Sequence, residues 1–156
     1  MQAPKFWYRS RSWQAILLSP LGVLYAWATA RRQKNARPTQ IDIPVICIGN
    51  LNVGGTGKTP TTIAIAQKLT SRGIAVHIVS RGYGGSLQAV TQVDPRSHTA
   101  DETGDEPLLM AAFAPTWVAN ERVAAARAAQ NAGADVILLD DGFQDPSLTK
   151  DLTIIV

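Results

Sequence analysis

The stretch NVGGTGKT, residues 52–59, limits how this chain can fold more than any other feature of the sequence. It follows a β-branched apolar run at residues 43–48 and precedes a helical pattern of apolar residues at 61–72. A glycine-rich loop that leaves a buried strand and opens a helix can point its backbone amides into one concavity, where they bind phosphate. The sequence therefore predicts a phosphate-binding loop between the first strand of a sheet and the helix that follows it.

One position of this loop departs from the usual pattern of Gly, four free positions and Gly-Lys-Ser/Thr. Asn52 stands where the first glycine is expected, but asparagine tolerates positive φ and three glycines remain to line the phosphates. A glycine-rich turn without this function is the alternative, and the strand–loop–helix context argues against it. Lys58 would reach the β- and γ-phosphates, and the Thr59 hydroxyl would be a ligand of Mg²⁺. The expected nucleotide-binding residues are Asn52, Val53, Gly54, Gly55, Thr56, Gly57, Lys58 and Thr59.

The rest of the chain alternates strand and helix patterns. Apolar, β-rich runs predict strands at residues 43–48, 74–79, 90–93 (short and at an edge), 116–119, 136–139 and 152–156. Helical patterns occupy residues 61–72, 107–113 and 121–131, whereas residues 94–103 are predicted to be a polar surface loop. This alternation predicts an α/β fold of the P-loop nucleotide-binding kind, with a mostly parallel sheet covered by helices on both faces. We expect this core to span residues 41–156 and the final run, residues 152–156, to be a buried strand.

Two pairs of acids lie where chemistry is expected. Asp140 and Asp141 follow the apolar run at 136–139, and a carboxylate at the end of a strand beside the phosphate-binding strand can hold Mg²⁺. A solvated turn is the alternative. Asp105 and Glu106 stand at a helix start, where acids also simply complement the helix dipole. Arg81, after the strand at 74–79, could contact a phosphate or be an ordinary surface arginine.

The N-terminal region, residues 1–40, has seven basic residues and no acid, and it encloses 18 uncharged residues at 13–30 with Trp13 and Trp27 near the ends. Basic flanks and interfacial tryptophans favour a helix associated with an anionic membrane. This helix either spans the bilayer or lies on its surface. An amphipathic helix packed on the domain is the alternative. Nucleic-acid binding is disfavoured, because the aromatic residues do not interleave with the basic ones. The single cysteine, Cys47, offers no disulfide and fits a cytosolic setting.

Four ordered motifs resemble the tetraacyldisaccharide 4'-kinase family: GNLNVGGTGKTP (49–60), SRGYGG (80–85), GDEPLL (104–109) and DDGFQ (140–144). Members phosphorylate the lipid A disaccharide precursor at the inner membrane of Gram-negative bacteria. The resemblance therefore implies ATP and Mg²⁺ as cofactors, the disaccharide precursor as substrate and a location at the cytoplasmic face of that membrane. It implies neither a nucleic-acid partner nor an obligate protein partner.

The resemblance also assigns roles to residues. It implies a catalytic set of Asp105, Lys58 and Asp141, with Asp105 as the base on the sugar hydroxyl, and a metal set of Thr59, Asp140 and Glu106. Members usually carry His or Asn after DDGFQ, so Asp145 departs from the family pattern. The match covers about the first half of a typical member and lacks the later half, which contains a histidine that partners the catalytic Asp. The apolar final run also suggests the front part of a longer protein.

Two other classes of function are compatible with the loop. A membrane-associated ATPase switch of the partition-ATPase type shares GGTGKT, but those proteins carry a lysine where this chain has Val53. The GDEP and DDGFQ motifs also argue against it. A nucleic-acid-dependent ATPase would need tight, salt-sensitive binding to DNA or RNA.

Overall fold

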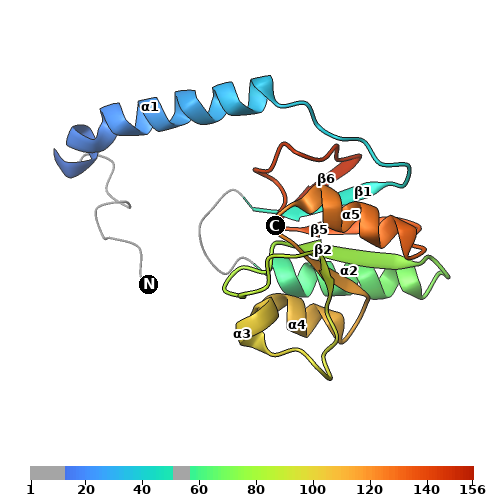
Figure 1. Cartoon of the computed structure of the whole chain (residues 1–156). Helices are drawn as coiled ribbons and strands as arrows, with labels where there is room; N and C mark the ends of the chain where they lie inside the picture. Colours follow the sequence, from blue (N-terminus) through green and yellow to red (C-terminus); the bar gives the residue numbers. More distant parts are fainter. Residues whose placement is uncertain (1–12, 51–56) are drawn as a thin grey trace. The chain divides into compact units, whose positions relative to one another are not determined.

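The computed structural model describes residues 13–50 and 57–156, and it divides into two compact units, Met1–Arg37 and Pro38–Val156 (Figure 1). The first unit contains helix α1 (Trp13–Asn35). The second contains a sheet with helices on it.

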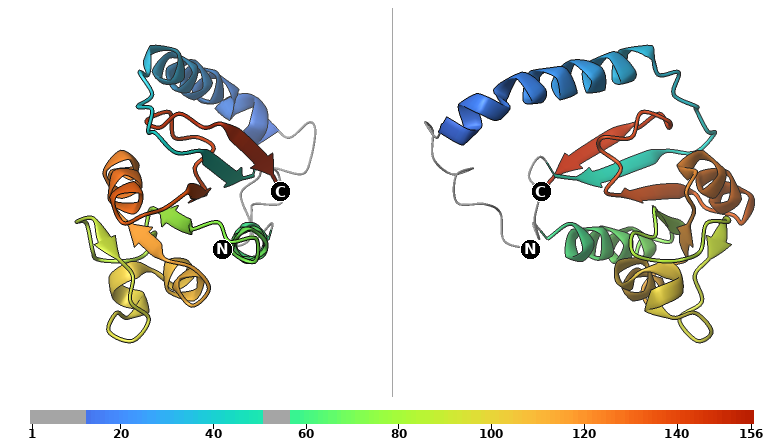
Figure 2. Two further views of the ribbon diagram at one scale, coloured as in Figure 1. Left: turned by 90° about the vertical axis from the view of Figure 1, so that its right-hand side faces the viewer. Right: turned by 60° about the vertical axis from the view of Figure 1, so that its left-hand side comes forward.

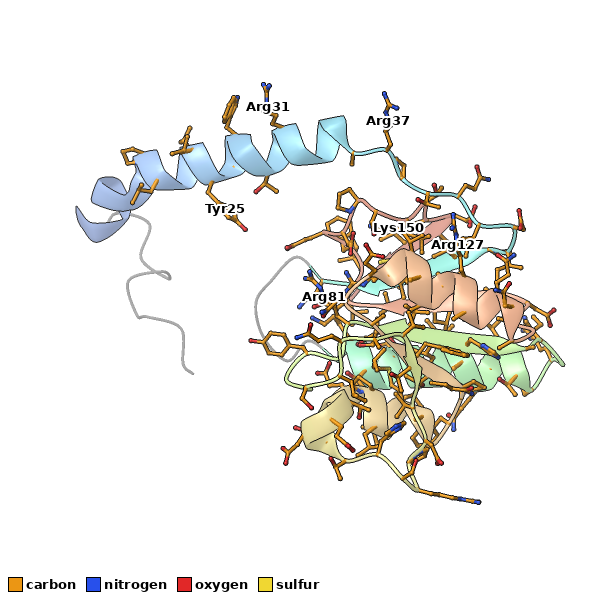
Figure 3. The ribbon with its side chains drawn as sticks, in the orientation of Figure 1. Tyr25, Arg31, Arg37, Arg81, Arg127 and Lys150 are labelled. Atoms are coloured by element: carbon orange, nitrogen blue, oxygen red, sulfur yellow. The ribbon has the colours of Figure 1, made fainter. Side chains whose placement is uncertain are left out.

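Helix α1 confirms that the uncharged segment is helical and extends it through the following basic residues to Asn35. Its apolar side chains are exposed: Leu21, Val23, Leu24, Tyr25 and Trp27. Tyr25 and Arg31 project to opposite sides of the helix (Figure 3). In the part of the chain that the structure describes, α1 included, no helix combines the length and apolar character needed to cross a bilayer.

The sheet of the second unit is mostly parallel, as predicted. Its strands are β1 (Val45–Gly49), β2 (Val76–Ser80), β3 (Thr91–Gln92), β4 (Thr116–Val118), β5 (Val136–Asp140) and β6 (Leu152–Ile155). They lie in the order β3-β4-β2-β5-β1-β6, and the short edge strand β3 is antiparallel to β4 while the other pairs are parallel. Strand β5 is buried along its whole length between β1 and β2, which explains its unbroken apolar run.

Helices cover both faces of this sheet, as the sequence predicts (Figure 2). On one face the alanines of α5 (Arg122–Asn131) pack with Cys47, Val79 and Leu139. On the other, α2 (Lys58–Thr70) and α4 (Asp105–Ala111) bury Ala66 and Met110 against the sheet. The alternating sides of each strand thus supply two separate apolar clusters, which hold the sheet rigid from both faces.

Two elements differ from the sequence prediction. Residues predicted as a polar loop contain a short helix, α3 (Ala100–Thr103), which begins with a capping box. The Glu102 carboxylate accepts hydrogen bonds from the backbone N–H of Thr99 at 2.8 Å and from its hydroxyl at 3.0 Å. The final strand, β6, was predicted to be buried, and this is wrong. It lies at an end of the strand order, and Leu152 and Ile155 are about half exposed.

Candidate active site

The candidate residues gather at the carboxyl edge of the parallel strands. Strands β1 and β5 are neighbours, with Ile48 opposite Asp140. The phosphate-binding loop and the loop that leaves β5 at Asp141, here called the acidic loop, therefore begin side by side. This confirms the expectation that the Asp140 strand lies beside the strand of the loop. Residues 52–56 of the predicted nucleotide site lie outside the described residues, so Gly57, Lys58 and Thr59 represent it here.

Gly57 and Lys58 form the start of α2. Gly57 caps the helix with φ 85°, a left-handed conformation that glycine adopts without strain. The Lys58 ammonium lies 3.2 Å from Asn50 Oδ1 and 3.1 Å from Asp141 Oδ1, and its side chain is mostly buried. The structure therefore brings together Lys58 and Asp141, two of the three predicted catalytic residues.

Asn50 and Thr62 take part in this arrangement although the sequence did not single them out. Asn50 is the buried residue directly after β1. Thr62 is fully buried on α2, and its hydroxyl lies 3.0 Å from the Lys58 carbonyl and 3.5 Å from Asp140 Oδ1. Thr59, the predicted metal ligand, is buried one turn earlier on the same helix. The position of Asn50 within the motif GNLNVGGTGKTP (49–60) was the available signal, whereas nothing in the sequence distinguishes Thr62 from other polar helix residues.

Asp140 ends β5 with only 2% of its surface exposed. Burial first, and the charges of Glu106 and Asp141 next, raise the pKa of its carboxyl to about 6, although Lys58 and Thr62 partly oppose them. A buried carboxylate surrounded by other acids is favourable only if a cation compensates it. This donor set therefore suits a hard divalent cation, which prefers carboxylate and hydroxyl oxygens.

The GDEP motif contributes Asp105 and Glu106, the first two residues of α4, and both are exposed. Glu106 lies close enough to Asp140 for its charge to act on that carboxyl. For the Asp105 carboxylate, the described residues provide no hydrogen bond or ion pair. Nor do they contain a group of three or more His, Cys, Asp and Glu side chains that could hold a metal ion. The base role of Asp105 stays a prediction.

The SRGYGG motif lies against the GDEP motif beside the start of α4. Gly104 has φ 91°, and a Cβ at that position would lie 2.7 Å from the Tyr83 carbonyl oxygen. The backbone directly after the SRGYGG motif also bonds to α3, because the Ser86 N–H donates to Asp101 O at 3.0 Å. Arg81 is exposed where β2 ends, on this edge of the sheet (Figure 3). The fold thus places the SRGYGG and GDEP motifs in contact.

Arg122 is the residue that sequence reasoning missed most clearly. It opens α5 and is only 5% exposed. Its guanidinium donates to Asp145 Oδ2 at 2.7 Å and to the Asp141 carbonyl at 2.7 Å. The unusual Asp145 therefore has a partner in the fold, directly behind the acidic loop.

Comparison with known proteins shows which family this chain matches. The sequence pattern described as Tetraacyldisaccharide-1-P 4'-kinase matches residues 14–156. Curated relatives named tetraacyldisaccharide 4'-kinase include one from Dinoroseobacter shibae, 59% identical over 100% of this chain and 47% of the relative. Another, from Jannaschia sp., is 54% identical over 100% of this chain and 48% of the relative. The chain thus spans about half the length of the curated relatives it matches.

A solved structure agrees with these matches. It is described as the "apo" form of LpxK from Aquifex aeolicus in complex with ATP. It superimposes with a TM-score of 0.80 at 30% identity, over 91% of this chain and 48% of that chain. The sequence pattern covers nearly the whole chain, and the fold agrees with it. The chain belongs to the Tetraacyldisaccharide-1-P 4'-kinase family.

Proposed function

We propose that the protein containing this chain transfers the γ-phosphate of ATP to the 4'-hydroxyl of the tetraacyldisaccharide 1-phosphate precursor of lipid A. The observation that carries the proposal is the contact between Lys58 and Asp141 across two motifs of this family. The relatives are named for this activity, and the neighbouring Aquifex aeolicus structure is described as a complex with ATP. Phosphoryl transfer depends mainly on positioning and charge neutralisation, which this edge of the sheet can supply.

Lys58 and the start of α2 bind the triphosphate in this proposal. Asn50 and Asp141 hold the Lys58 ammonium at the helix N-terminus, where the backbone N–H groups and helix dipole also favour an anion. An ammonium that is oriented before ATP binds loses little conformational entropy on binding. Lys58 therefore serves as a pre-positioned cation for the β- and γ-phosphates.

Mg²⁺ fits the acidic part of the site. Thr59, Asp140 and Glu106 would hold it, since Asp140 is buried and Glu106 adds negative charge beside it. When bound, the ion neutralises charge on the phosphate oxygens during transfer. Asp105, exposed at the first position of α4, accepts the proton of the attacking 4'-hydroxyl.

Helix α1 attaches the protein to the cytoplasmic face of the inner membrane in this proposal, where an acylated substrate resides. Its support is the set of exposed apolar side chains and a cation–π pair of Arg31 over Trp27, at 5.6 Å from the ring centroid. Flotation with anionic vesicles tests this. Leu21→Glu combined with Leu24→Glu should release the protein, whereas Ala26→Glu, on another side of α1, should leave most of it bound. Equal binding of all three proteins would reject the membrane role of this face.

The kinase proposal is tested with full-length protein, labelled ATP and the disaccharide precursor. Lys58→Met should lower the rate of product formation on the order of 100-fold or more, because a charge on the transferred phosphate loses its partner. Lys68→Met is the matched control, since Lys68 is exposed in the last turn of the same helix. Its rate should stay within about twofold. A folded wild-type protein that makes no phosphorylated lipid would reject the kinase proposal.

The partition-type ATPase switch is not favoured, because the family match covers the chain from residue 14 to residue 156. The same assay separates the two functions. A kinase consumes ATP in proportion to phosphorylated lipid, whereas a switch hydrolyses ATP without the lipid and faster on self-association.

A further inference from the structure

The start of α5 holds a buried charge that the proposed mechanism does not use. Arg122 is 5% exposed, less than any other arginine whose side chain the structure describes. Burying a guanidinium is costly unless its charge is paired and its donors are bonded. Arg122 pairs with Asp145, whose side chain is 20% exposed, at 2.7 Å. The two terminal nitrogens of Arg122 are bonded, whereas its buried Nε has no hydrogen-bond partner among the described residues. The contacts of the terminal nitrogens therefore indicate what Arg122 holds in place.

These contacts converge on the backbone of the acidic loop. The second terminal nitrogen of Arg122 donates to the carbonyls of Asp141 at 2.7 Å and Asp140 at 3.5 Å. Asp141 is the one described non-glycine residue with positive φ, at 53°. A left-handed conformation is uncommon outside glycine, although aspartate tolerates it better than most residues, and surrounding bonds can fix it. Here the Asp141 N–H bonds to Ile48 O at 2.9 Å while Arg122 holds its carbonyl.

The far side of the loop is fixed as well. Asp145 Oδ1 accepts from the Ser147 N–H at 2.9 Å, and the Lys150 ammonium donates to the carbonyls of Asp145 at 2.7 Å and Phe143 at 3.1 Å. Burial raises the pKa of Asp145, but the donors of Ser147 and Arg122 outweigh it, and the pKa falls to about 2. Asp145 is therefore ionised throughout the working pH range and keeps Arg122 oriented.

We propose that Arg122 and Asp145 form a positioning pair for Asp141: they hold its backbone so that its carboxylate stays in contact with Lys58. The proposal rests on the kinase function above and assigns it two residues that do not touch substrate. It also gives Asp145, which departs from the family pattern, a role in this chain. The contact that the pair maintains is the 3.1 Å ion pair between Lys58 and Asp141.

The kinetic test uses the full-length kinase under single-turnover conditions. Arg122→Gln and Asp145→Asn should each lower the rate of phosphoryl transfer on the order of 10- to 100-fold, as expected for a misplaced catalytic group. ATP affinity, measured by direct binding, should stay within about threefold, because Asn50 still holds the Lys58 ammonium. Arg127→Gln is the matched control, because Arg127 is an exposed arginine on the same helix (Figure 3). Its rate should not change.

A double-mutant comparison of Arg122 and Asp141 distinguishes a positioning role of Arg122 from a general contribution to the stability of the fold. If Arg122 acts through Asp141, Arg122→Gln should cost less than about twofold when Asp141→Asn is already present. The same loss in both backgrounds would overturn the proposal.

A readout without catalysis keeps this test independent of the kinase function. Amide hydrogen exchange in residues 141–147 should accelerate at least about 10-fold in Arg122→Gln, while β2 stays protected. If this variant does not fold, Asp145→Asn makes the same comparison with a smaller change. Unchanged exchange in 141–147 would overturn the positioning role. If the wild-type protein is inactive but Arg122→Gln still accelerates exchange in residues 141–147, only the kinase function is rejected and the positioning role stands.

Discussion

Replacing Asp140 by Asn should make the metal-free protein more stable at neutral pH while removing the proposed kinase activity. The side chain keeps its shape and can still accept the hydrogen bond of Thr62, so what changes is the buried charge. Burial first, and the charges of Glu106 and Asp141 next, raise the pKa of Asp140 from 3.8 to about 6. Each unit of pKa shift corresponds to about 1.4 kcal/mol. The ionised carboxylate therefore costs the native state about 3 kcal/mol.

The sign follows from proton linkage. Because the folded protein binds a proton more tightly here than the unfolded chain, the favourable contribution of protonated Asp140 is complete below pH 3.8. It is lost as the pH rises to about 6 and beyond. Asp140→Asn does not titrate. Its stability relative to wild type should therefore increase by about 3 kcal/mol between the acid limit and pH 8.

The assay is urea unfolding of wild type and variant in EDTA without nucleotide, repeated from pH 4 to pH 8. Asp101→Asn is the control, because Asp101 is an exposed acid on α3 outside the site. A difference between wild type and Asp140→Asn that stays flat with pH, or a variant that is less stable at pH 8, would refute the account of a costly buried charge. Kinase assays of the same samples should show the loss of rate that accompanies the gain in stability.

Two further predictions concern stability. Gly104→Ala should destabilise the protein by about 2–4 kcal/mol in urea unfolding, because φ is 91° and a Cβ would lie 2.7 Å from the Tyr83 carbonyl oxygen. Gly133→Ala has the same φ and nothing within 4 Å, so it should cost only about 1 kcal/mol, and equal losses would contradict the predicted clash. Burial lowers the pKa of His77, so its contribution to stability is present above pH 6.5 and is lost as the pH falls. His77→Gln should reduce the drop in stability between pH 7.5 and pH 5.5, and an unchanged drop would show that other groups cause it.

The sequence predicted those parts of the fold that depend on local pattern. The apolar run of β5, with acids directly after it, indicated a buried strand beside the phosphate-binding loop, and the register of Ile48 with Asp140 confirms this. The contact between Lys58 and Asp141 follows, since parallel neighbours end at the same edge. The capping box of α3 was also present in the sequence as Thr99 and Glu102, but it was not recognised.

What the sequence could not predict depends on where an element lies. Strand β6 has the apolar, β-branched pattern of a buried strand, yet its exposure follows from its place in the strand order. Arg122 begins an alanine-rich helix, where an arginine is normally solvated, and nothing in the local pattern indicates that it is buried. Its role appears only when the acidic loop is placed against α5.

The balance between the site's carboxylates and its cations explains why Arg122 pairs with Asp145 and not with the acids of the site. Among the described residues, the charges of Glu106 and Asp141 act on Asp140, and Lys58 is a cation that acts on Asp140 and pairs with Asp141. Arg122 bonds to backbone carbonyls and Asp145, so it fixes the loop without neutralising the site carboxylates. The acids therefore keep the negative charge that a divalent cation requires, at the cost in stability that Asp140→Asn should recover. If so, excess Mg²⁺ and ATP should stabilise wild type more than this variant and narrow the difference measured in EDTA.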